Sequence, residues 1–112
     1  MTAEQALTLV KVTHTAIWAV MATAILCIPL AALRRRFRAA AWLTALIVVE
    51  CVVLALNGGR CPLTDVAARF TSDRAANFDI YLPRWLAQNN KIIFGSLFVA
   101  GEVVCLWRWL SR

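Results

Sequence analysis

Three long apolar runs restrict what this chain can fold into. They cover residues 7–33, 39–57 and 83–110. At a rise of about 1.5 Å per residue, a helix of roughly 20 residues crosses the hydrocarbon core of a bilayer, which is about 30 Å thick. We therefore expect an all-α membrane protein with three transmembrane helices and a helical polar segment between the second and the third.

The composition agrees with this fold class and narrows the range of functions. Hydrophobic residues make up 62% of the 112 residues, whereas they make up under about half of a soluble domain. The three spans use most of the chain, so we predict a single transmembrane domain over residues 1–112. The net charge of +6 does not indicate nucleic acid, because the basic residues stand at the ends of the apolar runs.

The densest positive charge follows the first apolar run and comprises Arg34, Arg35, Arg36 and Arg38. Short loops rich in arginine stay in the cytoplasm, and Arg108 and Arg112 near the C-terminus agree with this orientation. We therefore expect the N-terminus outside, the arginine loop inside, the polar segment outside and the C-terminus in the cytoplasm.

The polar segment, residues 58–82, is called the polar cap below. The Asn-Gly-Gly sequence at 57–59 should end the second helix, because glycine readily adopts the left-handed conformation found after helix ends. Pro62 suits the first turn of a short interfacial helix that reaches residue 70. Thr64 or Asp65 is the expected cap of that helix.

Four ionisable residues fall within apolar runs: Lys11, His14, Glu50 and Glu102. A charge at the bilayer centre costs about 2.5–3.5 kcal/mol on insertion scales, so such residues usually have a partner or line a site. His14 and Glu50 each lie roughly 10 Å below the outer end of their helix, with Lys11 one turn above His14. This depth predicts a shared cluster, which either forms a polar site or joins the first two helices.

Glu102 lies deeper, roughly 16 Å below Lys91 and near the middle of the membrane. It can accept hydrogen bonds from threonine or tryptophan, stay protonated, or face a partner subunit. One histidine and one carboxylate are too few for a typical metal site, which has three or four ligands, so no metal is assigned.

The four cysteines are Cys27, Cys51, Cys61 and Cys105. No C-x-x-C spacing occurs and no disulfide pair emerges from the expected topology. Cys61 alone lies in the polar cap, before Pro62 and after a glycine-rich turn. Both a reactive thiol and a buried structural residue remain open for it.

The motif CPLT at residues 61–64, with His14 upstream and Phe78, Tyr81, Leu82 and Pro83 downstream, resembles a known family. This is an uncharacterised family of small bacterial inner-membrane proteins, classed only as a domain of unknown function. The resemblance covers about half of the chain, which departs from the family in having no clear fourth span. It implies a bacterial inner-membrane location and a unit formed under the loop by His14, the CPLT motif and Tyr81.

Small residues recur every four positions along the first run, at Thr15, Ala19, Thr23, Cys27 and Ala31. In lipid, helices associate through close packing of small residues, so this small-residue ridge is predicted to be a helix-packing face. The ridge, the small size of the chain and the intramembrane carboxylates favour a non-catalytic accessory or assembly subunit of a larger membrane complex.

Two other functions remain open. One is a haem-, quinone- or metal-binding protein that uses His14, Glu50 and Cys61, and the other is an oligomeric proton or ion pathway through Glu50 and Glu102. An enzyme is not expected, since no catalytic triad and no phosphate-binding glycine loop occurs. The accessory-subunit interpretation requires no cofactor, so none is predicted. The expected partners are the lipid bilayer and either other membrane subunits or further copies of the chain.

The residues of the loop motif, which are also candidate site residues, are Asn57, Cys61, Pro62, Thr64 and Tyr81.

Overall fold

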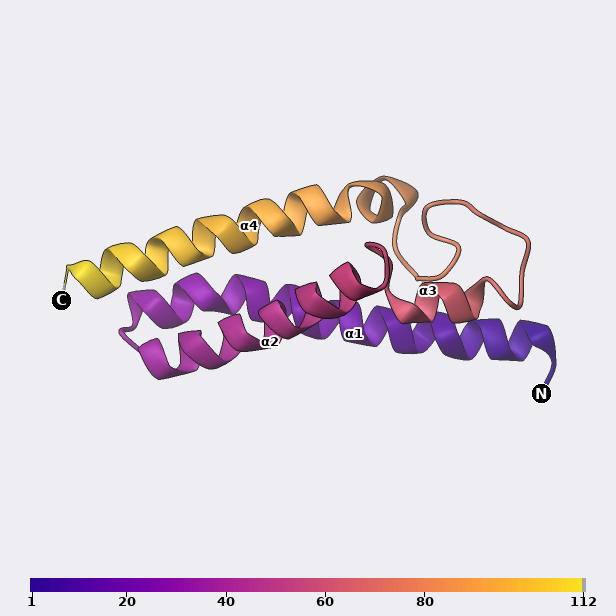
Figure 1. Cartoon of the computed structure of the whole chain (residues 1–112), viewed down its shortest axis with the longest axis horizontal. Helices are drawn as coiled ribbons and strands as arrows, with labels where there is room; N and C mark the ends of the chain where they lie inside the picture. The colour runs from indigo at the N-terminus through magenta and orange to yellow at the C-terminus, as the bar shows by residue number, and fades with distance from the viewer. Residues whose placement is uncertain (112) are drawn as a thin grey trace. The chain divides into compact units, whose positions relative to one another are not determined.

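A computed structural model describes residues 1–111, and Arg112, which supported the predicted orientation, lies outside them. The described residues form four helices and no strand: α1 (Ala3–Leu33), α2 (Phe37–Leu56), α3 (Pro62–Ala67) and α4 (Arg84–Leu110) (Figure 1). Helices α1, α2 and α4 are long and apolar enough to cross a membrane. This confirms the predicted all-α membrane fold, in which the short helix α3 lies in the polar cap.

Helix α1 begins at Ala3 rather than at residue 7, because its first turn is capped. The backbone N–H of Gln5 donates to Thr2 Oγ1 at 3.1 Å, and the Gln5 side chain accepts from the backbone N–H of Thr2 at 3.0 Å. This reciprocal pair is a capping box, which satisfies donors that a helix start leaves open. The polar residues before the apolar run therefore belong to the helix.

The glycine-rich turn ends α2 as predicted. Gly58 and Gly59 have φ angles of 67° and 83°, in the left-handed region that favours glycine. The backbone N–H of Gly59 donates to the carbonyl of Leu54 at 2.7 Å. This bond satisfies one of the carbonyls that a helix end leaves open.

Helix α3 differs from the prediction in its cap and its length. Cys61 occupies the N-cap position in an extended conformation, without a side-chain capping bond, and Pro62 stands in the first turn. The expected caps, Thr64 and Asp65, lie inside the helix instead, so that prediction is wrong. Their side chains bond to other parts of the polar cap, and α3 ends at Ala67, before residue 70.

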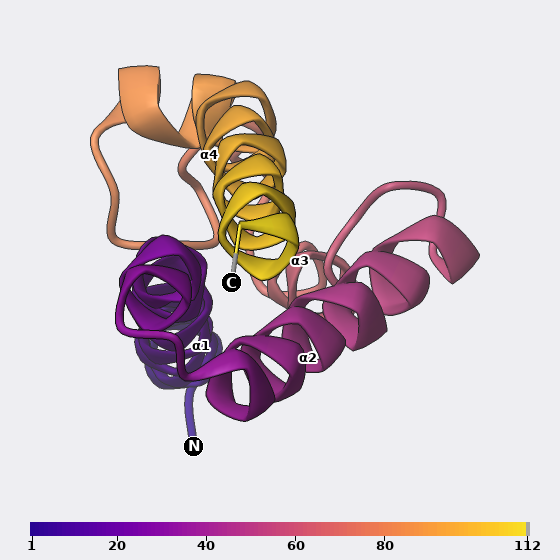
Figure 2. The ribbon, with the colours of Figure 1, turned by 90° about the vertical axis from the view of Figure 1, so that its left-hand side faces the viewer.

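The chain divides into two compact units. The first unit consists of Met1–Ala19 and Val52–Asn89, and the second of Val20–Cys51 and the described residues from Asn90 onward. The first unit holds the start of α1, the end of α2, helix α3 and the polar cap. The second unit holds the remainder of α1 and α2 and most of α4. In Figure 2 the end of α1, the start of α2 and the C-terminal end of α4 face the viewer.

The core of the second unit is formed by Ala24, Ile25 and Ile28 of α1 and Ile47 of α2. Partly buried side chains pack against this core: Met21, Leu43, Phe94, Phe98 and Cys105. Gly101 of α4 is buried against α1, since a Cβ atom at this position would lie 3.1 Å from Pro29 Cδ. Such close approach at a small residue is how helices pack in lipid.

The small-residue ridge of α1 takes part in packing within the chain at some positions only, such as Thr15, which accepts a hydrogen bond from the polar cap. Ala19 and Thr23 of this ridge are exposed and its other members are half-buried, whereas the buried residues of α1 are Val10, Ala22, Ala24, Ile25, Ile28 and Ala32. Isoleucine side chains of α1 fill the core of the second unit, and the role of the ridge as a helix-packing face stays a prediction.

Most of the apolar surface of α2 and α4 is left uncovered by the chain itself. Of the most apolar 18 residues of each helix, only 11% are buried in α2 and 6% in α4. Exposed side chains include Trp42, Leu56 and Ile92, at 73%, 84% and 71% exposure. Apolar surface on this scale is typical of a helix that faces lipid or another membrane protein.

Candidate functional site

A cluster of polar side chains connects the first half of α1 with the polar cap. His14 Nδ1 lies 3.1 Å from the backbone carbonyl oxygen of Asp79 and 3.6 Å from Asp79 Oδ2. Since a carbonyl oxygen only accepts, the contact assigns a proton to Nδ1. The Asp79 residue is only 6% exposed, so its carboxylate is held away from bulk solvent.

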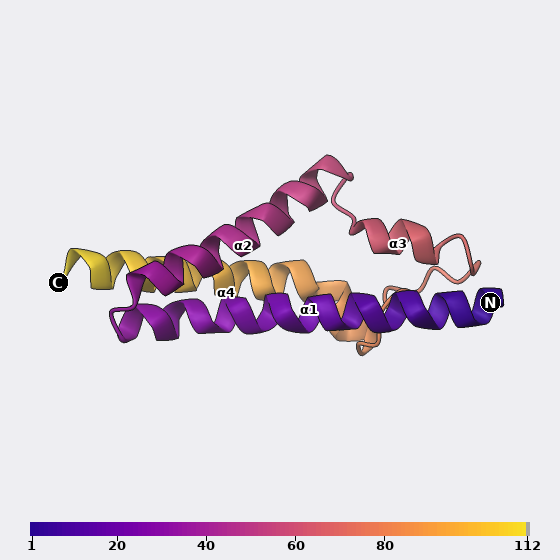
Figure 3. The same cartoon turned by 90° about the horizontal axis from the view of Figure 1, so that it is seen from below.

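Two residues of the CPLT motif complete this cluster. The Thr64 hydroxyl donates a hydrogen bond to Asp79 Oδ2, and the Cys61 side chain forms a hydrogen bond with His14. Cys61 is the N-cap residue of α3, and Thr64 lies in the first turn, where its backbone N–H donates to the Cys61 carbonyl at 2.9 Å. We call His14, Cys61, Thr64 and Asp79 the cap cluster. Figure 3 shows α3 beside the N-terminal part of α1, where the cluster forms.

The segment after Asp79 is attached to the same helix one residue further along. The backbone N–H of Tyr81 donates to Thr15 Oγ1 at 2.9 Å, while the Thr15 hydroxyl donates to the carbonyl of Lys11 at 2.7 Å. Lys11 Nζ lies 4.4 Å from the centroid of the Tyr81 ring, within the range of a cation–π contact. Lys11 therefore has an aromatic partner in the polar cap.

A second network joins the turn after α2 to α3. Asn57 Nδ2 donates to Asp65 Oδ2 and to the carbonyl of Arg60, both at 2.8 Å, and Arg60 Nε donates to Asp65 Oδ1 at 3.0 Å. The hydrogen bonds from Asn57 and Arg60 lower the pKa of Asp65 below its ordinary value of 3.8. The network fixes the path of the chain between α2 and α3.

Acidification should weaken the attachment of α3 to this turn. The pKa of Asp65 is lower in the folded chain than in the unfolded chain. Its contribution to the stability of the folded chain is therefore complete above the unfolded pKa, near 3.8, and is lost as the pH falls through the folded pKa. The carboxylate is 42% exposed, so the effect should be small and reduced by salt. Comparing the unfolding of Asp65→Asn with the unsubstituted chain should show a difference at pH 7 that shrinks by pH 3. A difference independent of pH would contradict this account.

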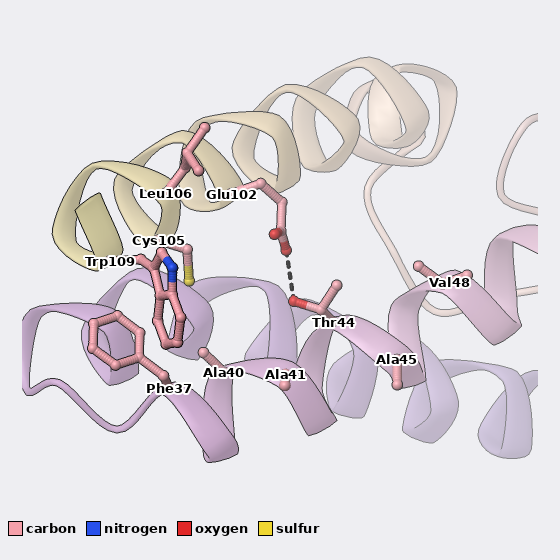
Figure 4. A pocket seen from close by; sticks show the side chains of 10 residues that line it. All are labelled: Phe37, Ala40, Ala41, Thr44, Ala45, Val48, Glu102, Cys105, Leu106 and Trp109. Atoms are coloured by element: carbon pink, nitrogen blue, oxygen red, sulfur yellow. Dashed lines mark hydrogen bonds between the residues drawn. The ribbon is translucent and has the colours of Figure 1, made fainter.

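In the second unit, an open groove runs between α2 and α4 (Figure 4). Its volume is about 550 Å³. The lining comprises Phe37, Ala40, Ala41, Thr44, Ala45 and Val48 of α2 and Glu102, Cys105, Leu106 and Trp109 of α4. We call it the α2/α4 groove. The Thr44 hydroxyl donates to Glu102 Oε1 at 2.6 Å, which places a carboxyl group in an otherwise apolar groove.

The structure thus gives partners to most of the residues singled out in the sequence. His14, Cys61 and Thr64 meet in the cap cluster, Lys11 contacts Tyr81, and Asn57 bonds to α3. Glu50 belongs to the second unit and is half-buried, and its side chain makes no hydrogen bond or ion pair within residues 1–111. The cluster of His14 with Glu50 stays a prediction.

Asp79 was not anticipated as a site residue, although one signal was available. It is the only acidic residue in the apolar stretch from Phe78 to Pro83, and a lone carboxylate in such a stretch usually has a partner. Across the described part of the chain, no three His, Cys, Asp or Glu side chains are grouped closely enough to hold a metal ion.

Comparison of the chain with protein-family models, with curated proteins and with solved structures gives no match.

Proposed function

We propose that this chain is a small integral membrane protein that serves as a non-catalytic accessory or assembly subunit of a larger membrane complex. The observation that carries the proposal is the α2/α4 groove, which combines small side chains with a carboxyl group on a surface that the chain leaves open. These features suit a transmembrane helix of a partner subunit.

The α2 side of the groove has the pattern of a helix-packing surface. Ala40 and Thr44 are four residues apart, as are Ala41 and Ala45, so the small side chains line one face. Ala41 and Ala45 are exposed. In a bilayer, small residues with this spacing let a second helix approach closely, and van der Waals contact then stabilises the pair.

Glu102 supports a polar contact across the same surface. Its carboxyl group accepts one hydrogen bond, from Thr44, and retains further lone pairs beside the open groove. Polar groups within the hydrocarbon region usually face protein and hydrogen-bond to it, because unsatisfied groups there are costly. A partner helix that carries a hydrogen-bond donor would satisfy this carboxyl group.

The proposed location is the bacterial inner membrane, with the N-terminus outside and the C-terminus in the cytoplasm. The bacterial assignment rests on the family resemblance. The orientation rests on the arginine loop between α1 and α2, whose arginine side chains are exposed. Arg108 Nη2 donates to the carbonyl of Leu33 at 3.0 Å, so a fifth guanidinium group joins this end of the second unit and strengthens the charge bias.

A second candidate function is favoured by the contact between His14 and Cys61, which offers an imidazole and a thiol to a ligand. A haem- or quinone-binding protein would use this pair. Purified protein with a visible absorption band that disappears in His14→Ala would support this candidate, and a colourless preparation would count against haem.

Enlarging a groove side chain should reduce recovery of the partner. In Ala41→Leu the added atoms would enter the groove, whereas Ala39 is exposed on α2 and does not line it. After gentle detergent extraction from the native membrane, co-purifying proteins should fall by about tenfold for Ala41→Leu, which corresponds to roughly 1.4 kcal/mol of binding. Ala39→Leu should retain them. A stable monomer without co-purifying membrane proteins, identified by mass spectrometry, would contradict the proposal.

A further inference from the structure

We propose that Cys61 is a nucleophilic thiol, activated by His14, that undergoes thiol–disulfide exchange with a disulfide substrate. This activity belongs to the cap cluster in the first unit. It does not depend on the accessory role assigned to the α2/α4 groove.

The central observation is the arrangement of the cap cluster around one imidazole. Thr64, three residues after Cys61, donates to the Asp79 carboxylate that lies 3.6 Å from His14 Nδ1, and the Cys61 side chain forms a hydrogen bond with the same histidine. The thiolate is the nucleophilic form of cysteine, and an adjacent imidazole promotes it by taking the thiol proton. His14 is the one histidine in the sequence, and Cys61 is the cysteine that forms a hydrogen bond with it.

The remaining members of the cap cluster hold the imidazole in place. The Asp79 carbonyl accepts from His14 Nδ1 at 3.1 Å, and the Asp79 carboxylate lies 3.6 Å from the same atom. A nearby carboxylate stabilises the positive charge that the imidazole acquires with the proton. Thr64 in turn donates to that carboxylate. The cap cluster therefore brings together a thiol, an imidazole that can take its proton, and a carboxylate that stabilises the imidazolium.

The other cysteines provide a contrast within the same molecule. Cys27, Cys51 and Cys105 lie in α1, α2 and α4, the three helices of membrane-spanning length, and none of the four cysteines forms a disulfide. Cys61 precedes the short helix α3, in the polar cap between α2 and α4, and is partly accessible. It is therefore the cysteine best placed to meet a polar or interfacial substrate.

The chemistry balances without an added oxidant. His14 takes the proton of the Cys61 thiol, and the thiolate attacks one sulfur of the substrate disulfide. A new sulfur–sulfur bond to Cys61 forms as the substrate bond breaks, and the second sulfur leaves as a thiolate. That leaving group receives the proton held by the imidazole. The product is a mixed disulfide on Cys61, which a second thiol can resolve.

The test measures the reaction of the full chain in lipid nanodiscs with 4,4′-dithiodipyridine, an uncharged aromatic disulfide. Mass spectrometry of peptides assigns the modified cysteine. The reference is a thiol without an imidazole partner, provided by Ser72→Cys in a Cys61→Ser background, since Ser72 is exposed in the polar cap. At pH 7 Cys61 should react about tenfold faster than this more exposed reference thiol.

His14→Gln should remove this advantage and bring the rate of Cys61 to within about twofold of the reference. Asp79→Asn, which keeps the backbone carbonyl, should produce a partial loss. If His14→Gln does not fold, the comparison of Cys61 with the reference thiol in otherwise unsubstituted chains still decides the matter. A Cys61 rate less than about threefold above the reference would overturn the proposal, as would a rate that His14→Gln leaves unchanged in folded protein.

Discussion

Replacing Gly101 by leucine should destabilise the second unit far more than the same replacement at Gly95. A Cβ atom at residue 101 would lie 3.1 Å from Pro29 Cδ and 3.5 Å from Ile28 Cγ2, whereas at residue 95 nothing lies within 4 Å. Ile28 is fully buried at 0% exposure, and the proline ring is rigid, so neither neighbour can move aside easily. Overpacking of this kind costs about 1–3 kcal/mol, and leucine adds three carbons beyond the Cβ.

The two variants are matched because both glycines lie in α4 and both changes remove the helix penalty of glycine, which is about 1 kcal/mol relative to alanine. Unfolding in mixed micelles can be followed by circular dichroism. Relative to the unsubstituted chain, the unfolding midpoint should be lower for Gly101→Leu and unchanged or higher for Gly95→Leu. Equal midpoints would mean that α4 does not approach α1 at Gly101.

The helices could be predicted from the sequence because length and hydropathy are local properties. Each span is an apolar run long enough for a bilayer, and the Asn-Gly-Gly turn gives a local reason for α2 to end. The start of α1 was predicted too late because hydropathy does not register a capping box formed by Thr2 and Gln5. Helix ends depend on such hydrogen bonds, while helix centres depend on composition.

The partners of the site residues were harder to predict, since depth along a helix does not determine which way a side chain points. His14 and Glu50 were paired by depth alone. The partner that the structure gives His14 is Asp79, which is 65 residues away in sequence and lies in a segment without helical periodicity. The core residues of α1 were hard to predict for a related reason. Each residue along a helix rotates the direction of the side chain by about 100°, and the isoleucines at 25 and 28 fill the core beside the small residues of the ridge.

Asp79→Ala should loosen the polar cap more than any other single carboxylate change in the first unit. Asp79 is 6% exposed and accepts the Thr64 hydroxyl, so alanine would leave that hydroxyl without its acceptor and His14 without a nearby carboxylate. Hydrogen bonds to charged groups contribute about 1.5–3 kcal/mol, and unpaired buried groups add to the loss. We expect α3 to be destabilised by about 2–4 kcal/mol, measured as amide hydrogen exchange at least about thirtyfold faster in α3.

Two further variants separate this effect from a general loss of negative charge. Asp79→Asn keeps an oxygen that can accept from Thr64, so its α3 exchange rates should lie between those of Asp79→Ala and the unsubstituted chain. Asp73→Ala removes an exposed carboxylate whose hydrogen bond is local, to the backbone N–H of Ala75, and should change stability by less than about 0.5 kcal/mol. If Asp73→Ala and Asp79→Ala accelerate exchange equally, the polar cap is not held by the cap cluster. A selective effect at residue 79 would instead show that contacts to α1 hold α3 and the CPLT motif in place.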